Sequence, residues 1–408
     1  MSFRLKDLGP GLLYAGAAIG VSHLVQSTRA GVLFGLDLLL VVLLVNLIKY
    51  PFFAVGATYP ALTGQNLLWG YKKVGAWALH LFSISHLLSV FVVQAAVTVV
   101  TVGVLQVSLL SEVDLKVLNF GFLVLFLLMG RLGKFSFIDH LMKGIVFVLA
   151  LLTVVAVFMS LTLNPHFSLG VFSITNKEHF LFLIALVGWM PGPMDIPVWQ
   201  SLWCLSKRKE NKNFDHKKAL FDFRLGHGVT TLLALLFIIL GAGLSTGSVE
   251  IPGSAAQFAR FLVDLYVKNL GEGFRPVIAI LAFLAMLSTS LTCFDAFTRL
   301  NLAVVQSYKS DLDGESSKNK FLSSVVLIVG TQLIVFFALS NMRALVDFAT
   351  MLSFSIAPLL AYLNTRLMLS DDIPLKYRLS KKQLYFNMLG ITLFALLTLS
   401  FLLTLTSF

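Results

Sequence analysis

The hydrophobic positions of this chain form long continuous runs that are separated by short polar segments. The runs do not alternate with polar residues, which favours membrane-spanning helices over the strands of a transmembrane barrel. At about 20 apolar residues per span, we predict eleven helices in an all-α polytopic membrane protein without a soluble domain. The predicted spans are residues 11–31, 33–57, 76–106, 115–130, 137–163, 178–203, 225–245, 275–305, 320–340, 344–367 and 384–406.

Two of the predicted spans contain sequences that a continuous helix does not tolerate well. The first is interrupted at GVSH (20–23), and the sixth at GWMPGPMDIP (188–197), where prolines and glycines cluster. The interruptions are five spans apart. Paired broken helices at matching positions are typical of inverted-repeat transporters with a site near the midplane, although prolines also produce simple kinks. We therefore predict repeats at 9–163 and 178–367, followed by an extra C-terminal helix at 384–406.

Charge supports the membrane assignment and predicts an orientation. Charged residues make up 12% of the chain, about half the share of a soluble domain. The net charge of +11 comes from basic residues in short connecting segments, so it does not indicate nucleic-acid binding. With a cytoplasmic N-terminus, the inner segments hold 22 basic residues and the outer segments 6. We predict an inner-membrane protein with a retained first span, an external C-terminus and a surface-lying amphipathic stretch at 250–274.

Motifs of soluble enzymes are missing from the sequence. It contains no P-loop, no G-x-G-x-x-G and no H-E-x-x-H, which excludes ATP-driven pumping by this chain on sequence grounds. Cys204 and Cys293 fall in or beside separate apolar runs and predict no disulfide. We expect a protein that is not an enzyme and needs no cofactor.

Three segments carry a resemblance to a known family. GPGLLYAGAAIGVSHLVQSTRAGVLFG (9–35), GWMPGPMDIPVWQS (188–201) and STSLT (288–292) are similar to the first, sixth and eighth helices of the Nramp family of divalent metal transporters. The order and number of spans fit this family along nearly the whole chain. The resemblance implies a LeuT-like fold of five plus five helices, with helices one and six broken, and transport of a divalent metal ion.

The chain departs from the family at the residues that bind metal. The Asp-Pro-Gly-Asn motif of the family corresponds to Gly20, Val21, Ser22 and His23, so its carboxylate is missing. In the sixth span Met190 matches the soft metal ligand of the family, while a glycine replaces the following histidine. The third span contains no acidic residue, and its titratable groups are His80 and His86. The resemblance thus implies an inherited fold with an altered site.

Ionisable residues inside spans are costly and indicate function. His23 is a candidate metal ligand or proton acceptor, or else a cap for the freed backbone of the broken helix. Asp195 is a candidate for the missing carboxylate, or the partner of Arg29 or Lys49, or an N-cap. With Met190 these residues form the predicted metal site, His23, Met190 and Asp195. Gly20, Ser22 and Val187 complete the predicted solute-binding set.

A second group of candidates concerns charge movement. Lys49 lies too deep in the second span to reach water, and we expect it to pair with Asp195 or Asp295 and to take the role of a coupling cation. Asp295 and Arg299 are spaced to satisfy each other on one helix. Thr292 is a candidate for lining a cation path, although hydroxyls also bond back to their own helix. With His86, the predicted coupling or internal-charge set is Lys49, His86, Asp295 and Thr292.

Together these features predict a secondary transporter that works by alternating access between spans one and six. Its predicted partners are the lipid bilayer and a divalent metal ion, the latter through the family resemblance. Because Gly20 removes an anionic ligand and opens space, a small organic solute coupled to protons or sodium is the alternative. A non-transporting receptor or complex subunit is the further alternative. The sequence assigns no oligomeric state.

Overall fold

The predicted apolar runs are helical throughout the part of the chain that can be described. The structure is a computed structural model that describes residues 8–108, 112–131, 135–163, 169, 171–243, 255–309, 311, 313–314, 316–338 and 342–406. Its first half contains α1 (Pro10–Ala18), the π-helical segment η2 (Val21–Ser27), α2 (Thr28–Phe34), α3 (Leu39–Thr63), α4 (Leu67–Val74), α5 (Ala76–Ser108), α6 (Leu115–Arg131) and α7 (Phe135–Leu163). Its second half contains α8 (Lys177–Trp189), α9 (Ile196–Glu210), α10 (His216–Ala242), α11 (Ala255–Leu270), η3 (Glu272–Phe274), α12 (Arg275–Tyr308), α13 (Ser317–Ala338), α14 (Met342–Ser355), α15 (Ala357–Leu367), η4 (Leu375–Tyr377) and α16 (Lys381–Thr406).

Each predicted span corresponds to one helix or to one broken helix. Among the described residues, six helices are individually long and apolar enough to cross a bilayer, and α14 with α15 form a bent seventh with an angle of 41°. The six are α3, α5, α10, α12 with η3, α13 and α16. The remaining predicted spans are the shorter apolar helices α6 and α7 and the broken pairs α1–α2 and α8–α9. The all-α polytopic fold is therefore confirmed.

The boundaries differ from the prediction in a few places. The short helix α4 was not predicted, α9 runs seven residues past the predicted end at 203, and the tenth span is also broken, at Ile356. The helix α11 falls within the predicted amphipathic stretch. The predicted ends at 244–245 and 339–340, residues 250–254 of that stretch, and Arg4, Lys6 and Lys134 lie outside the described residues.

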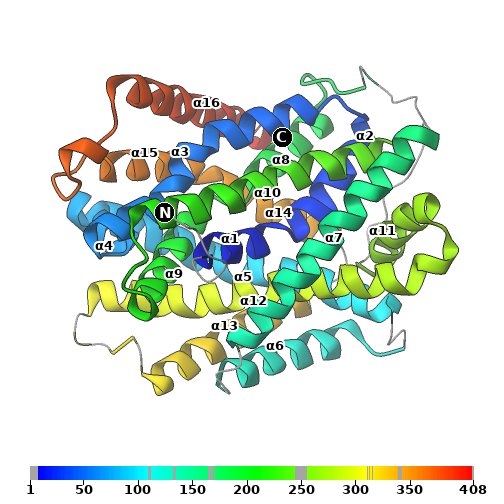
Figure 1. Ribbon diagram of the computed structural model, residues 1–408, viewed down its shortest axis with the longest axis horizontal. Coiled ribbons are helices and arrows are strands. Elements are labelled where there is room, and N and C mark those ends of the chain that lie inside the picture. The colour runs from blue at the N-terminus through cyan, green and yellow to red at the C-terminus, as the bar shows by residue number, and fades with distance from the viewer. Residues whose placement is uncertain are drawn as a thin grey trace.

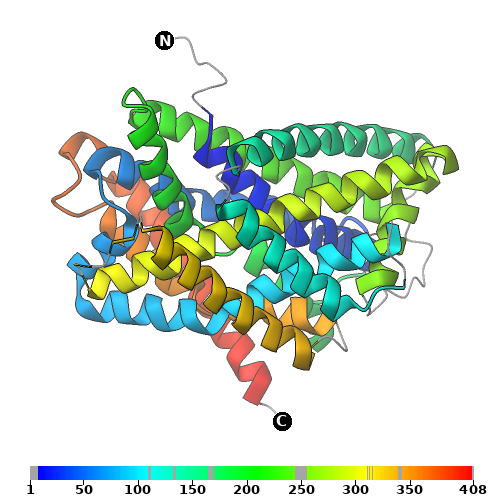
Figure 2. The ribbon, with the colours of Figure 1, turned by 90° about the horizontal axis from the view of Figure 1, so that it is seen from below.

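The helices form a bundle with two opposite faces. The ends of α4, α9 and α15 lie on one face, at the left of Figure 1, and α2 and α11 lie at the other end, at the right. We call these the first face and the second face. The helix α5 is the most enclosed span, with 83% of its apolar window buried, whereas α16 has 28% buried and stands at the edge of the bundle (Figure 2).

Both halves of the broken first span pack against α10. Asp222 of α10 accepts hydrogen bonds from the backbone N–H groups of Gly9 and Gly11, at 3.0 and 2.6 Å, and so caps the start of α1. Gly31 of α2 lies so close to the backbone of Ile238 that a side chain at position 31 has no room. Small residues permit this close helix contact, which is a common device in membrane bundles. The first break is consequently held between two fixed halves.

Candidate functional site

A small cavity lies between the two broken spans, where the prediction places a solute site. Its volume is about 20 Å³, which is enough for roughly one water molecule. Most of its wall is apolar, and hydroxyl groups come from Ser22 and Thr289. The lining residues are Ala17, Ala18, Val21, Ser22, Val93, Val97, Trp189, Gly192, Pro193, Ile196, Trp199, Thr289 and Cys293.

The second break follows from the prolines that end α8. Pro191 and Pro193 have no N–H to continue the helix, and the chain leaves α8 at Met190 with an extended backbone. Met190 is fully buried, and its peptide bond to Pro191 is cis. The hydroxyl of Ser27 in η2 points to the sulfur of Met190, with Oγ and Sδ 3.6 Å apart. The last residue of η2, the segment that follows the first break, thus contacts the second break at this pair.

The first break is centred on Gly20, and Thr289 of α12 fills the space beside it. A Cβ atom at position 20 would lie 2.5 Å from Cγ2 of Thr289 and 2.7 Å from its Cβ. The hydroxyl of Thr289 also donates to the carbonyl oxygen of Gly16 at 2.7 Å. Our expectation that Gly20 opens space for a larger solute is therefore wrong, because Thr289 fills the space that a side chain at position 20 would take.

His23 is fully buried and both of its ring nitrogens face backbone carbonyl groups. Nδ1 lies 2.7 Å from the carbonyl oxygen of Ala18, and Nε2 lies 2.8 Å from that of Thr230 in α10. The hydroxyl of Ser22 contacts Nδ1 at 2.7 Å and also the Ala18 carbonyl. The ring therefore links the backbone released by the first break to α10, which is the geometry of the capping alternative.

Asp195 stands at the start of α9 and is 8% exposed. Its side chain makes no cap hydrogen bond with that helix. Arg29 and Lys49, the two predicted cationic partners, bind other groups, so the predicted ion pair of Asp195 with either is wrong. In the part of the chain that the structure describes, no three His, Cys, Asp or Glu side chains are grouped closely enough to hold a metal ion.

Lys49 of α3 is fully buried and binds backbone oxygen atoms at the second break. Its Nζ donates to the carbonyl groups of Val187, Gly188 and Gly192 at 2.7, 3.1 and 3.2 Å. The expectation that Lys49 pairs with Asp195 or Asp295 is wrong, because its three N–H groups are satisfied by carbonyls. Of the predicted solute-binding residues, Val187 is thus a partner of Lys49 and is not part of the cavity wall.

Arg29 forms a partly buried ion pair that the sequence analysis missed. Its Nη1 and Nη2 donate to Oδ1 and Oδ2 of Asp347 in α14 at 2.7 and 3.1 Å. Gln26 bridges the pair, accepting from Arg29 at 3.1 Å and donating to Asp347 at 3.2 Å. Asp347 is the one acidic residue of the predicted span 344–367. An ionisable residue inside a span indicates a buried partner, so this residue could have been identified from the sequence. The pair ties α2 to α14 on the second-face side of the cavity.

The other predicted charge-moving residues lie away from the cavity. Asp295 pairs with Arg299 as predicted, with Nε 2.9 and 2.8 Å from its two oxygens. The hydroxyl of Thr292 donates to the carbonyl of Ser288 in its own helix at 2.7 Å.

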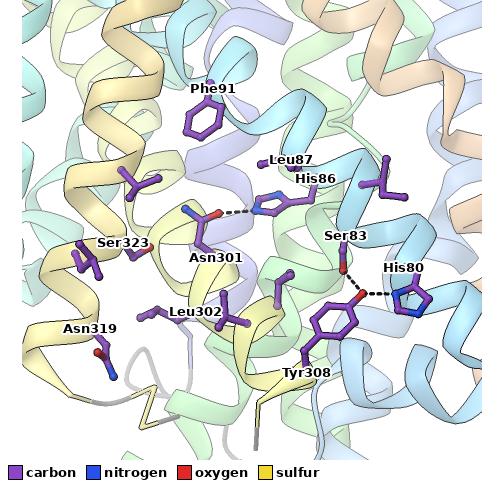
Figure 3. Close-up of a pocket in the computed structure, with 15 residues that line it drawn as sticks. His80, Ser83, His86, Leu87, Phe91, Asn301, Leu302, Tyr308, Asn319 and Ser323 are labelled. Carbon is purple, nitrogen blue, oxygen red and sulfur yellow. Dashed lines mark hydrogen bonds between the residues drawn. The ribbon is translucent and has the colours of Figure 1, made fainter.

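His86 lines a separate cavity of about 580 Å³ between α5, α12 and α13 (Figure 3). There its Nε2 donates to Oδ1 of Asn301 at 2.7 Å. In the same cavity His80 donates to the hydroxyl of Tyr308 at 2.9 Å, and that hydroxyl donates to Ser83 at 3.1 Å (Figure 3).

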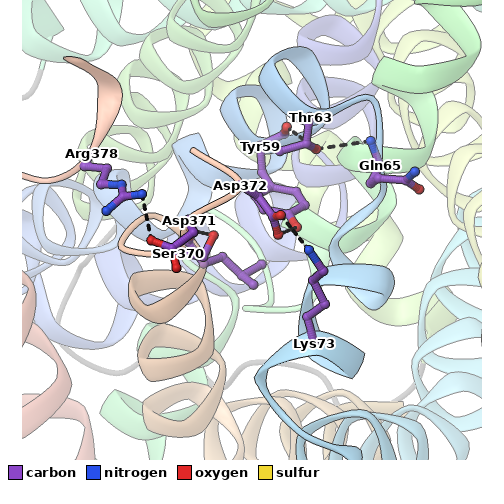
Figure 4. Close-up of polar contacts among 9 residues, drawn as sticks. Tyr59, Thr63, Gln65, Lys73, Ser370, Asp371, Asp372 and Arg378 are labelled. Atoms are coloured by element: carbon purple, nitrogen blue, oxygen red, sulfur yellow. Dashed lines mark hydrogen bonds and ion pairs between the residues drawn. The ribbon is translucent and has the colours of Figure 1, made fainter. Parts of the chain in front are cut away.

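A polar cluster on the first face joins three further elements. Asp372, in the turn after α15, accepts from Lys73 of α4 at 2.6 Å and from the hydroxyl of Tyr59 of α3 at 3.4 Å (Figure 4). The cluster thus ties α3, α4 and the turn after α15 together on this face.

Known proteins match this chain along nearly its whole length. The chain is 30% identical over 411 residues to an uncharacterised protein of Pasteurella multocida strain Pm70, covering 98% of this chain and 92% of the relative. Among solved structures, a manganese transporter of Eremococcus coleocola in complex with an aromatic bis-isothiourea compound superposes with a TM-score of 0.70. It is 14% identical, and the match covers 97% of this chain and 85% of that one.

Two other transporters share the fold. MhsT in complex with L-phenylalanine gives a TM-score of 0.67 at 14% identity, with 99% of this chain and 98% of that chain covered. Mhp1, a nucleobase-cation-symport-1 family transporter, gives 0.60 at 17% identity, with 97% and 88% covered. At these identities the matches establish the LeuT-like fold alone.

The sequence itself also matches a family profile described as natural resistance-associated macrophage protein-like, over residues 11–404. A match of this extent covers both breaks and the cavity between them. The chain therefore belongs to the Nramp family, as a multi-pass secondary transporter and not an enzyme.

Proposed function

We propose that this transporter carries a small organic solute with a largely apolar body, and not a bare divalent metal ion. The observation that carries the proposal is the contact of Thr289 with Gly20, which fills the position of the carboxylate of the family. Alternating access around the cavity between the two breaks is part of the same proposal, since the fold class binds solutes at such breaks.

The wall of the cavity supports an organic solute. Valine, alanine and isoleucine side chains and the rings of Trp189 and Trp199 surround it, and Ser22 and Thr289 supply two hydroxyl groups. Binding sites for small organic molecules are typically apolar with a few polar groups that fix the orientation of the ligand. The cavity of about 20 Å³ has no room for such a solute, so binding requires the halves of the broken spans to move apart.

The charges around the cavity disfavour a dication. A divalent ion that sheds water needs several oxygen ligands and usually carboxylates. The hydroxyl groups of the wall carry no charge, and the ammonium of Lys49 binds the carbonyl of Gly192, which itself lines the cavity. A fixed positive charge next to the site raises the energy of any bound cation.

Transport of a divalent metal ion remains the second candidate, because one observation favours it. Met190 matches the soft ligand of the family, and its sulfur lies at the junction of the two breaks, facing Ser27. A thioether selects late transition metals. This candidate also draws support from the fold match with a protein named as a manganese transporter.

Binding by the purified full-length protein separates the two candidates. We expect calorimetry to detect no heat from manganese or zinc ions, and a thermal-shift screen of small neutral and zwitterionic organic molecules to yield a stabilising solute. Ser22→Ala should weaken binding of that solute about 5- to 10-fold, the loss of one hydrogen bond. Ser83→Ala, in the separate cavity of Figure 3, is the matched control and should leave its affinity unchanged.

Metal binding would contradict the proposed organic solute. Saturable manganese or zinc binding that Met190→Leu abolishes establishes the metal candidate and rejects the organic solute. Met388→Leu, on the exposed side of α16, is the control.

A further inference from the structure

The carbonyl groups that bind Lys49 have the arrangement of a cation site. Val187 and Gly188 are in the last turn of α8, where the final carbonyls of a helix lack backbone donors. The residue four positions after Val187 is Pro191, which has no N–H to offer. The C-terminal end of a helix also carries a partial negative charge. Three oxygen atoms therefore converge on one point where the field favours a positive ion.

The ammonium of Lys49 occupies that point from a different helix. All three of its contacts are to these carbonyls, and the side chain is fully buried. In transporters with broken helices, unwound carbonyls and half-helix C-termini are the groups that bind coupling cations. Buried carbonyls replace the water shell of an alkali ion in the same way.

We propose that Lys49 is a tethered cation that permanently fills a monovalent-cation site at the second break, so that this carrier needs no mobile cation there. The inference goes beyond the proposed solute and does not depend on it. The tether also holds α3 to the last turn of α8 and to the break itself, because Gly188 is in that turn and Gly192 lies within the break.

The proposal predicts that removing the ammonium exposes a site for potassium or sodium. Lys49→Ala shortens the side chain and leaves three buried carbonyls without a partner, which a cation can satisfy. The melting temperature of the full chain in detergent is measured in potassium, sodium and N-methylglucamine chlorides at equal ionic strength. Lys49→Ala should be less stable than the wild type in glucamine, and one alkali ion should raise its Tm saturably by about 3 °C or more.

Two controls make the response specific. The wild-type Tm should be the same in all three salts. Lys72→Ala should behave like the wild type, because Lys72 also donates to a backbone carbonyl, that of Ser307 at 2.8 Å, but is exposed to solvent. Lys49→Met, which keeps most of the side-chain volume and removes the charge, carries the same test if Lys49→Ala does not fold.

Two results overturn the proposal. One is a folded Lys49 variant whose Tm is identical in all three salts, which shows that the carbonyls bind no cation. The other is an equal alkali-ion response in the wild type, which places the responsive site elsewhere in the protein.

Discussion

At the scale of single residues, the site is determined by contacts that leave little trace in the sequence. The family resemblance predicts that Gly20 stands at the position of a missing carboxylate. The residue that takes its space, Thr289, is 269 positions away, and nothing local links the two. Lys49 and His23 were correctly identified as buried. Their partners are backbone carbonyls, which every residue type carries, so the sequence contained no sign of them.

Gly20→Ala tests the packing at the first break. The added methyl group meets Thr289 at 2.5–2.7 Å, so the backbone has to shift. Overpacking of this kind costs about 1–3 kcal/mol, and we expect the free energy of unfolding to fall by that amount. Thr289→Gly in the same chain removes the clash and should recover part of the loss.

The measurement is denaturant or thermal unfolding of the single and double variants. Gly121→Ala in α6 is the matched control, since a Cβ there meets no atom within 4 Å. A double variant no more stable than Gly20→Ala alone contradicts the assignment of the clash to Thr289.

His23→Ala distinguishes a structural cap from a metal ligand. Loss of the ring leaves the carbonyls of Ala18 and Thr230 without their imidazole partner, at a cost of about 1–3 kcal/mol in stability. We expect the melting temperature to fall in metal-free buffer and the fall to persist, unchanged, when manganese is added. The opposite outcome indicates metal ligation. In that case the variant is as stable as the wild type in metal-free buffer, and manganese stabilises the wild type but not the variant.

At the scale of elements, proline and glycine clusters predicted two of the three breaks. The dense cluster at 188–197 ends α8, and Gly20 ends the first half of span one. The break at Ile356 was missed because its only marker is Pro358 at the start of α15, and a single proline is equally compatible with a kink. The pairing of Arg29 with Asp347 was missed because the sequence analysis considered only Asp195 as a partner of Arg29.

The Arg29–Asp347 pair should hold the cavity closed toward the second face, because it ties α2 to α14. Cys293 lines the cavity and is only 3% exposed, so the rate at which its thiol is labelled reports access to the cavity. In a Cys204→Ser background, which leaves Cys293 as the single thiol, we expect Arg29→Met to raise the rate of maleimide labelling at least several-fold. The rate is followed by mass spectrometry of the full-length protein.

The control for this prediction is a pair that is far more exposed. Arg275→Met removes the contacts with Asp264 and Glu272 next to α11, where ion pairs contribute little. Its labelling rate should equal that of the background. If Arg29→Met labels no faster than Arg275→Met, the pair does not control access to the cavity.

At the scale of the whole molecule, the apolar runs predicted a helical membrane bundle, and the five-span spacing of the two breaks together with the family resemblance predicted the inverted-repeat fold. Both signals extend over many residues, so an unusual residue at a single position does not change the predicted helices. We infer from the same spacing that residues 9–163 and 178–367 are the two inverted repeats, with α16 added at the edge. The identity of the solute is decided by a few side chains in one small cavity, and it could not be predicted in this way.

The distribution of basic residues predicts which face is cytoplasmic. The chain begins α1 on the first face, where Gly9 contacts Lys207 of α9, and the predicted number of spans is odd. The last turn of α9 on the first face carries Lys207, Arg208 and Lys209, and the predicted inner segments hold 22 basic residues against 6. Because basic loops are retained in the cytoplasm, we expect the first face to be cytoplasmic and the C-terminus external.

Reporter fusions in a bacterial host test this orientation. Alkaline phosphatase, which is active only outside the cytoplasm, should be active when fused after Phe408 and inactive when fused after Lys212, between α9 and α10. Green fluorescent protein should give the reverse pattern, because it matures in the cytoplasm. The predicted spans place the two fusion points on opposite sides of the membrane, so each is the control for the other. Phosphatase activity at Lys212 with fluorescence at Phe408 inverts the assignment, and it also places the Arg29–Asp347 pair on the cytoplasmic side of the cavity.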